Sequence, residues 1–157
     1  MFRTENSVGM LKSIAMIGGL AILLWSLGLP SLRFIEAANV SSYSDTLEDS
    51  APSADSNHTI VYTATAGLTA GQNLTITFPA GFDLTGIVED DVDLDIAGAT
   101  TTTAGAPSGS TWGVGIAGQV ITITSGTGVI AASDIVTIRI GDNAIDSGTG
   151  VNKINNP

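Results

Sequence analysis

Hydrophobic and polar residues alternate along most of the chain beyond Ala38. In the segment His58–Ala64, the residues Ile60, Tyr62 and Ala64 occupy every second position. A period of two places such residues on one face of a β-strand and the residues between them on the other. The same alternation predicts further strands, whose inward residues are Leu74 and Ile76; Val92, Leu94 and Ile96; Trp112, Val114 and Ile116; Ile121 and Ile123; and Val136, Ile138 and Ile140.

Turn-forming residues separate these segments, among them Ala70-Gly71, Pro79-Ala80-Gly81 and Gly141-Asp142-Asn143. A less regular strand is predicted over Val40–Leu47. Six or seven short strands, each with one apolar face, predict an all-β fold, and an antiparallel β-sandwich fits this pattern better than a small barrel. The polar segment 100–110 is predicted to be a long exposed loop. Long helical segments do not alternate with the strands, which argues against a nucleotide-binding α/β fold.

The N-terminal part of the chain has the pattern of a targeting segment. Residues 13–32 carry no charge, with Lys12 before them and Arg33 after. This pattern predicts a hydrophobic helix, either a signal peptide cleaved after Ala37 or Ala38 or an uncleaved membrane anchor. Both interpretations predict export, so we divide the chain into a leader (residues 1–38) and a β-sandwich domain (residues 39–157).

Charge and cysteine content narrow the classes of function. Beyond Ala38, only Arg139 and Lys153 oppose thirteen acidic residues, a formal charge of −11. A surface this negative repels phosphate backbones, so nucleic acid is excluded as a partner. The chain has no cysteine, which excludes disulfides and thiolate metal sites. The domain must therefore be stabilised by its hydrophobic core, and an exported chain without cysteine favours a prokaryotic surface protein.

Residues 68–82 read LTAGQNLTITFPAGF. A Gly turn, a strand of alternating threonines and a Pro-Ala-Gly-Phe ending resemble the immunoglobulin-like repeats of large bacterial surface proteins. The chain is also similar to exported proteins of ultrasmall candidate-phyla bacteria. The resemblance covers residues 40–157 and implies an immunoglobulin-like sandwich of about seven strands. Such proteins usually contain several repeats, so we expect a chain that continues past Pro157. Either the sandwich lacks its last strand because the chain is a fragment, or it is left with an open edge.

Residues 88–98, VEDDVDLDIAG, contain five acidic residues within seven positions. On a strand, Asp91 and Asp95 would lie roughly 13 Å apart. One calcium ion, which binds oxygens at about 2.3 to 2.6 Å, cannot collect both. We therefore predict that Asp93 and Asp95 form a solvent face. The sequence leaves a calcium site formed by Glu89, Asp90 and Asp91 as an alternative, with Asp142 or Asp146 as a further ligand.

Other residues with chemical potential fit structural roles better. His58 is the only histidine, and a zinc or copper site without a second histidine or cysteine is improbable on ligand chemistry. We predict a polar residue at a strand edge. Trp112 alternates with Val114 and Ile116, which favours a core position over ligand stacking. No Gly-x-Ser-x-Gly elbow precedes a helix, so no catalytic residue is predicted.

These features predict an exported, non-enzymatic β-sandwich that acts as a structural or adhesive module of the cell surface. Other surface proteins or neighbouring repeats are the expected partners, together with the membrane if residues 13–32 are retained. The alternative is an extracellular carbohydrate- or protein-binding module, with or without stabilising calcium, whose site lies in the loops 100–110 and 141–150. An enzyme is the least supported class.

Overall fold

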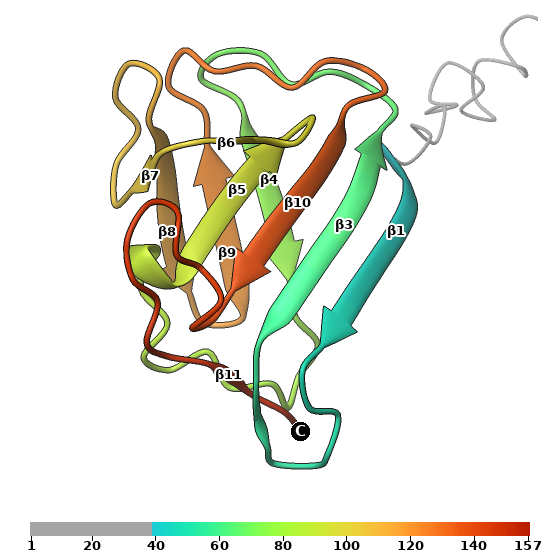
Figure 1. Cartoon of the computed structure of the whole chain (residues 1–157), viewed down its shortest axis with the longest axis vertical. Helices are drawn as coiled ribbons and strands as arrows, with labels where there is room; N and C mark the ends of the chain where they lie inside the picture. Colours follow the sequence, from blue (N-terminus) through green and yellow to red (C-terminus); the bar gives the residue numbers. More distant parts are fainter. Residues whose placement is uncertain (1–38) are drawn as a thin grey trace, which may run out of the picture. The chain divides into compact units, whose positions relative to one another are not determined.

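Two sheets face each other across an apolar core in the computed structural model (Figure 1). The structure describes residues 39–157, and the predicted leader with its hydrophobic segment lies outside them. The first sheet has the order β1 (Val40–Leu47), β3 (His58–Ala64), β10 (Ile135–Ile140), β5 (Val92–Ile96) and β6 (Ala99–Thr100). The second has the order β4 (Asn73–Thr77), β9 (Val120–Thr124), β8 (Trp112–Ala117) and β7 (Thr103–Ala104).

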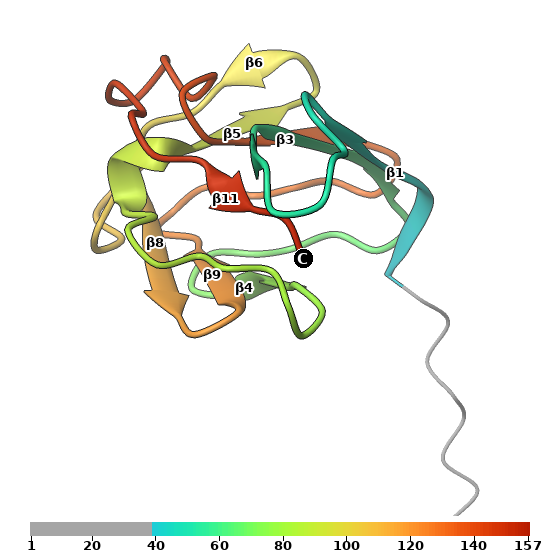
Figure 2. The same ribbon diagram turned by 90° about the horizontal axis from the view of Figure 1, so that it is seen from below.

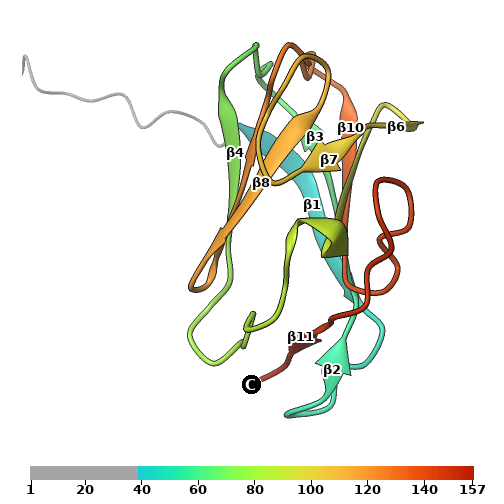
Figure 3. The same cartoon turned by 90° about the vertical axis from the view of Figure 1, so that its left-hand side faces the viewer.

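Smaller elements complete the domain. The short strands β2 (Asp55–Ser56) and β11 (Ile154–Asn155) pair with each other beside the lower ends of β1 and β3, as seen in Figures 2 and 3. A single 3-10 turn, η2 (Glu89–Asp91), leads into β5. All strand pairs are antiparallel except β7 with β8. No helix among residues 39–157 is long and apolar enough to cross a membrane.

The predicted alternation is confirmed by the core. Side chains at the inward positions of β3, β10 and β9 are buried on one face, as period-two geometry requires. Trp112 is 2 % exposed and belongs to the core, as predicted. The strand predicted over Val40–Leu47 is also present, with the same bounds.

The predicted antiparallel sandwich is confirmed at the level of fold class. The order of its strands can be compared with the constant-type immunoglobulin arrangement, in which the last strand lies beside the penultimate one and shares a sheet with the third. Here the last long strand, β10, lies between β3 and β5, while β9 pairs with β4 and β8. The chain therefore leaves the first sheet for β4, returns to it for β5 and β6, forms β7, β8 and β9 in the second sheet, and ends its last long strand in the first.

The prediction of a long exposed loop over residues 100–110 is partly wrong. Thr103 and Ala104 form β7 against the start of β8, and Thr103 is only 6 % exposed. A backbone bond from Trp112 N to Thr102 O, 2.8 Å long, extends this contact. The polar composition of this segment predicted a loop. Composition alone does not show that threonine hydroxyls can bond to main-chain groups at the edge of a sheet.

Candidate functional site

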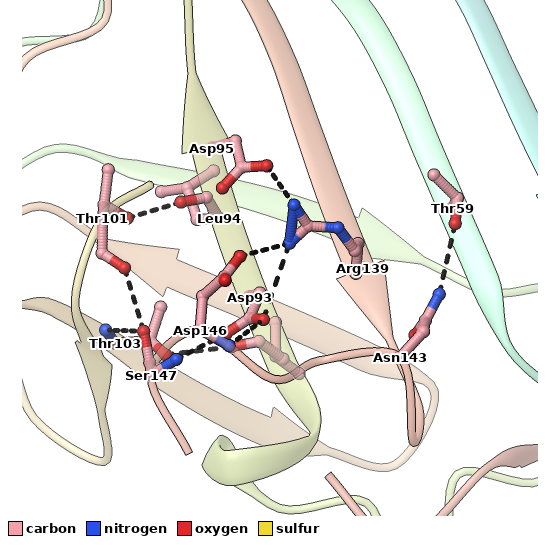
Figure 4. A network of polar contacts seen from close by, with 11 residues as sticks. Thr59, Asp93, Leu94, Asp95, Thr101, Thr103, Arg139, Asn143, Asp146 and Ser147 are labelled. Atoms are coloured by element: carbon pink, nitrogen blue, oxygen red, sulfur yellow. Dashed lines mark hydrogen bonds and ion pairs between the residues drawn. The ribbon is translucent and has the colours of Figure 1, made fainter. Parts of the chain in front are cut away.

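Three aspartates, Asp91, Asp93 and Asp95, form a row along η2 and β5, and we call them the carboxylate row. Val92 and Leu94 alternate with them and enter the core, which directs the row to the opposite face of the sheet. The prediction that Asp93 and Asp95 form a solvent face is wrong for Asp93, while Asp95 keeps a side-chain exposure of 14 %. Residues 141–153, here called the C-terminal loop, cover this face (Figures 1 and 4). Asp91 is 0 % exposed and Asp93 is 1 % exposed.

Asp91 binds the far end of the C-terminal loop. Its carboxylate accepts bonds from Val151 N at 2.7 Å, Asn152 N at 3.0 Å and Asn152 Nδ2 at 2.9 Å. A fourth comes from Val88 N at 2.9 Å, at the start of the turn η2. Burial opposes ionisation, but the bonds from Asn152, Val88 and Val151 outweigh it and hold the pKa of Asp91 below its ordinary value.

Asp93 binds the middle of the same loop. Its two oxygens accept bonds from Asp146 N at 2.8 Å and Ser147 N at 3.1 Å (Figure 4). Arg139 lies opposite Asp93 on β10, and its guanidinium pairs with Asp95 and, at 2.6 Å, with Asp146. Two backbone amides and one arginine therefore bond to a group of three carboxylates that would otherwise repel one another.

Asp95 is the least well satisfied member of the row. One of its oxygens pairs with Arg139, and the other, Oδ1, is buried without a partner among residues 39–157. Burial raises the pKa of Asp95 above its ordinary value; Arg139 opposes this shift, while Asp146 and Asp93 add to it. The ion pair with Arg139 therefore does not fully offset the burial of the Asp95 carboxylate.

Ser147 joins the C-terminal loop to residues 100–103, four threonines that precede β8 and are here called the threonine segment. Its hydroxyl donates to Thr101 O and accepts from Thr103 N, each at 2.9 Å. The hydroxyls of Thr101 and Thr103 donate in turn to Leu94 O at 2.7 Å and Val92 O at 2.9 Å, at the edge of β5. The two loops predicted as an alternative binding site thus lie together, fixed to one strand.

The predicted calcium ligands are directed at different segments. Asp91 contacts Asn152, whereas the Asp90 carboxyl lies beside Gly148 and the Glu89 carboxyl beside Gly105. Asp146 pairs with Arg139, and Asp142 with Lys153 at 3.1 Å. Within the described residues, no group of three or more His, Cys, Asp or Glu side chains has a geometry that holds a metal ion. Calcium binding at Glu89, Asp90 and Asp91 stays a prediction.

His58 is a buried residue, and the prediction that it lies at a polar strand edge is wrong. Its ring is 0 % exposed, with Nδ1 at 2.8 Å from Asp45 Oδ2 and the rings of Phe78 and Phe82 at centroid distances of 5.3 Å and 5.8 Å. Because a carboxylate only accepts hydrogen bonds, the ring donates through Nδ1. The sequence carried the signal: His58 is in phase with Ile60, Tyr62 and Ala64.

Comparison with known proteins adds no identity. No family model, no curated protein and no solved structure matches this chain. Its function must therefore be inferred from how its own residues are arranged. In that arrangement, Asp91, Asp93 and His58 are buried and bonded to the chain itself, so they act as anchors of loops and strands.

We predict that Asp91→Asn destabilises the fold by about 3 kcal/mol or more at neutral pH, because an amide group would face buried N–H donors. A carboxyl with a depressed folded pKa stabilises above its unfolded pKa, and this stability is lost as the pH falls through the folded value. The difference in unfolding free energy between the variant and wild type should therefore be constant near neutral pH and become smaller below about pH 4. Urea unfolding followed by circular dichroism measures it.

The matched control is Asp90→Asn, which removes the same charge from an exposed neighbour. We expect it to change the unfolding free energy by less than about 0.5 kcal/mol. Equal effects of the two substitutions would show that Asp91 acts through net charge alone.

Asp45 and His58 yield a second prediction, made as a double-mutant cycle. Asp45→Ala leaves His58 Nδ1 buried without its acceptor and should cost about 1 to 3 kcal/mol of unfolding free energy. In a His58→Leu background the same substitution should cost less than about 0.5 kcal/mol, because no donor remains. Additive effects in the cycle would mean that the two residues are not coupled.

Proposed function

We propose that the protein is a non-enzymatic, exported β-sandwich that serves as a structural or adhesive module of a cell surface. The observation that carries this proposal is that the most acidic segment of the chain bonds to the domain's own backbone. Asp91 and Asp93, the buried members of the most acidic segment, accept backbone bonds from the C-terminal loop. Acids bonded in this way stabilise a domain and do not present a reactive carboxylate to a substrate.

Composition supports the same proposal. The domain holds its C-terminal loop and residues 101–103 with carboxylates, hydroxyls and one arginine, where many exported domains use disulfides. Export of the chain is proposed from the uncharged run 13–32, and a repeat of the immunoglobulin-like class from residues 68–82. Neighbouring repeats or other surface proteins are the proposed partners.

Export is tested by fusing residues 1–38 to alkaline phosphatase lacking its own leader, an enzyme that is active only outside the bacterial cytoplasm. We expect phosphatase activity from this fusion. The matched control carries Leu23→Arg and Leu24→Arg, which interrupt the apolar run and should abolish activity. Activity in the membrane fraction would show an anchor and activity in the soluble fraction a cleaved signal; inactivity of the unmodified fusion would contradict export.

A second candidate function is carbohydrate binding, with or without calcium, at residues 100–110, the first of the two loops predicted as a binding site. The observation that favours it is a pocket of about 360 Å³ lined by threonine and serine residues, with the exposed Val129 beside them. Hydroxyl groups next to an apolar surface suit the alternating polar and apolar faces of a sugar. The lining includes Thr100, Thr102 and Ser110.

A glycan array probed with the purified protein, in calcium and in chelator, tests this candidate. Binding of a defined sugar class that Thr102→Val removes would support it. If calcium stabilises the site, adding calcium should raise the melting midpoint by mass action, and Asp90→Asn should remove the increase. No sugar bound above background would leave the structural or adhesive function, and an unchanged midpoint would contradict the calcium site.

A further inference from the structure

Strand β4 forms an unpaired edge of the second sheet. It pairs on one side with β9. Bonds from Phe78 N to Gln119 O and from Ser125 N to Gln72 O show that the backbone N–H and C=O groups of its even-numbered residues point toward β9. In an antiparallel ladder, the odd-numbered residues then direct their N–H and C=O groups away from that neighbour. The backbone groups of Asn73, Thr75 and Thr77 have no partner among residues 39–157.

Two other edges, at β1 and along β5, are protected. At β1, the register shifts between Ser41 and Ser44, where Ser42 has a φ of 51°, and a charged residue, Asp45, follows. At β5, threonine hydroxyls cover the free carbonyls. Bulges, charges and covered carbonyls are the usual means by which edges avoid pairing with another chain. The segment β4, NLTIT, is regular and uncharged and contains no proline.

A groove of about 440 Å³ runs beside this edge, between β4 and the strands β1 and β3. Its walls include Val40, Tyr62, Leu74 and Ile130, and none of its lining residues is charged. Burial raises the pKa of Tyr62 to about 12, so its hydroxyl stays protonated at neutral pH. The groove therefore offers apolar contacts and main-chain bonding sites along the same line.

The shape of the sandwich decides what fits there. In Figures 1 and 2, the first sheet reaches farther than the second on the side of the free β4 edge, so β1 faces the space next to that edge. If a whole second copy joined its β4 to this edge, its own first sheet would meet β1. A single extended strand has no second layer and avoids this clash.

We infer that the β4 edge binds one extended segment of another chain, which pairs with the backbone of Asn73 to Thr77 and places apolar side chains against Tyr62 and Leu74. This addition of a strand is a known way in which sheets bind peptides. Acidic residues are excluded from the bound segment, because the domain carries a formal charge of −11 from thirteen acids and two bases.

The probe is a fluorescent peptide with the sequence of residues 118–126, GQVITITSG, because this segment contains β9, which already pairs with β4. Binding to the purified protein is followed by fluorescence anisotropy. We expect saturable binding. The matched control peptide is N-methylated at the alternate amides that would face β4, and it should bind at least about tenfold more weakly, since several backbone hydrogen bonds are lost.

Two protein variants locate the site. Val40→Glu adds a carboxylate to the groove, and Ile135→Glu adds the same charge at an exposed isoleucine outside it. We expect the first to weaken binding at least about fivefold and the second less than about twofold. Thr75→Pro removes one N–H of the free edge and should also weaken binding at least about threefold. If this last variant does not fold, the two glutamate variants still decide.

Three results would overturn the inference: no saturable binding, equal binding of the two peptides, or equal effects of the two glutamate variants. Self-association of the protein that Val40→Glu abolishes, without peptide binding, would show that a second copy is the occupant. Peptide binding is measured on purified protein and export in cells, so failure of either leaves the other test intact.

Discussion

The fold depends on two buried carboxylates, Asp91 and Asp93, that accept backbone N–H groups of the C-terminal loop. A loop that covers a sheet must satisfy its own amides, and this one has no neighbouring strand along most of its length. A buried carboxylate likewise needs several donors to remain charged. The loop and the acids therefore satisfy each other, and neither would be stable in its position alone.

This reciprocal bonding has a consequence for the remainder of the domain. Ser147, held by Asp93, is the residue that reaches the threonine segment and orders it against β5. The part of the β5 edge that does not pair with β6 is thereby covered by threonine hydroxyls. The Asp93 contact therefore supports both the C-terminal loop and, through Ser147, residues 101–103. The domain is stabilised by a chain of polar contacts where an exported domain with cysteines would be stabilised by disulfides.

The sequence predicted the strands well because their signal is local. Period-two alternation identified the buried face of each long strand, and the bounds of Val40–Leu47 agree with the structure. The roles of the acids could not be predicted in the same way, because Asp91 and Val151 are sixty residues apart. Alternation correctly placed Asp93 opposite the core, but it does not reveal what covers that face. His58 was different, since its phase already indicated the inward side.

The uneven protection of the edges links the structure to the proposed role. Acidic side chains give most of the surface a charge that keeps copies of the protein apart. The groove beside β4 lacks charged residues, and the edge next to it retains unpaired backbone groups. A domain selected only for solubility would have a charge or a bulge at this edge, as β1 has. The absence of such a charge or bulge at β4 fits the inference that another chain pairs there.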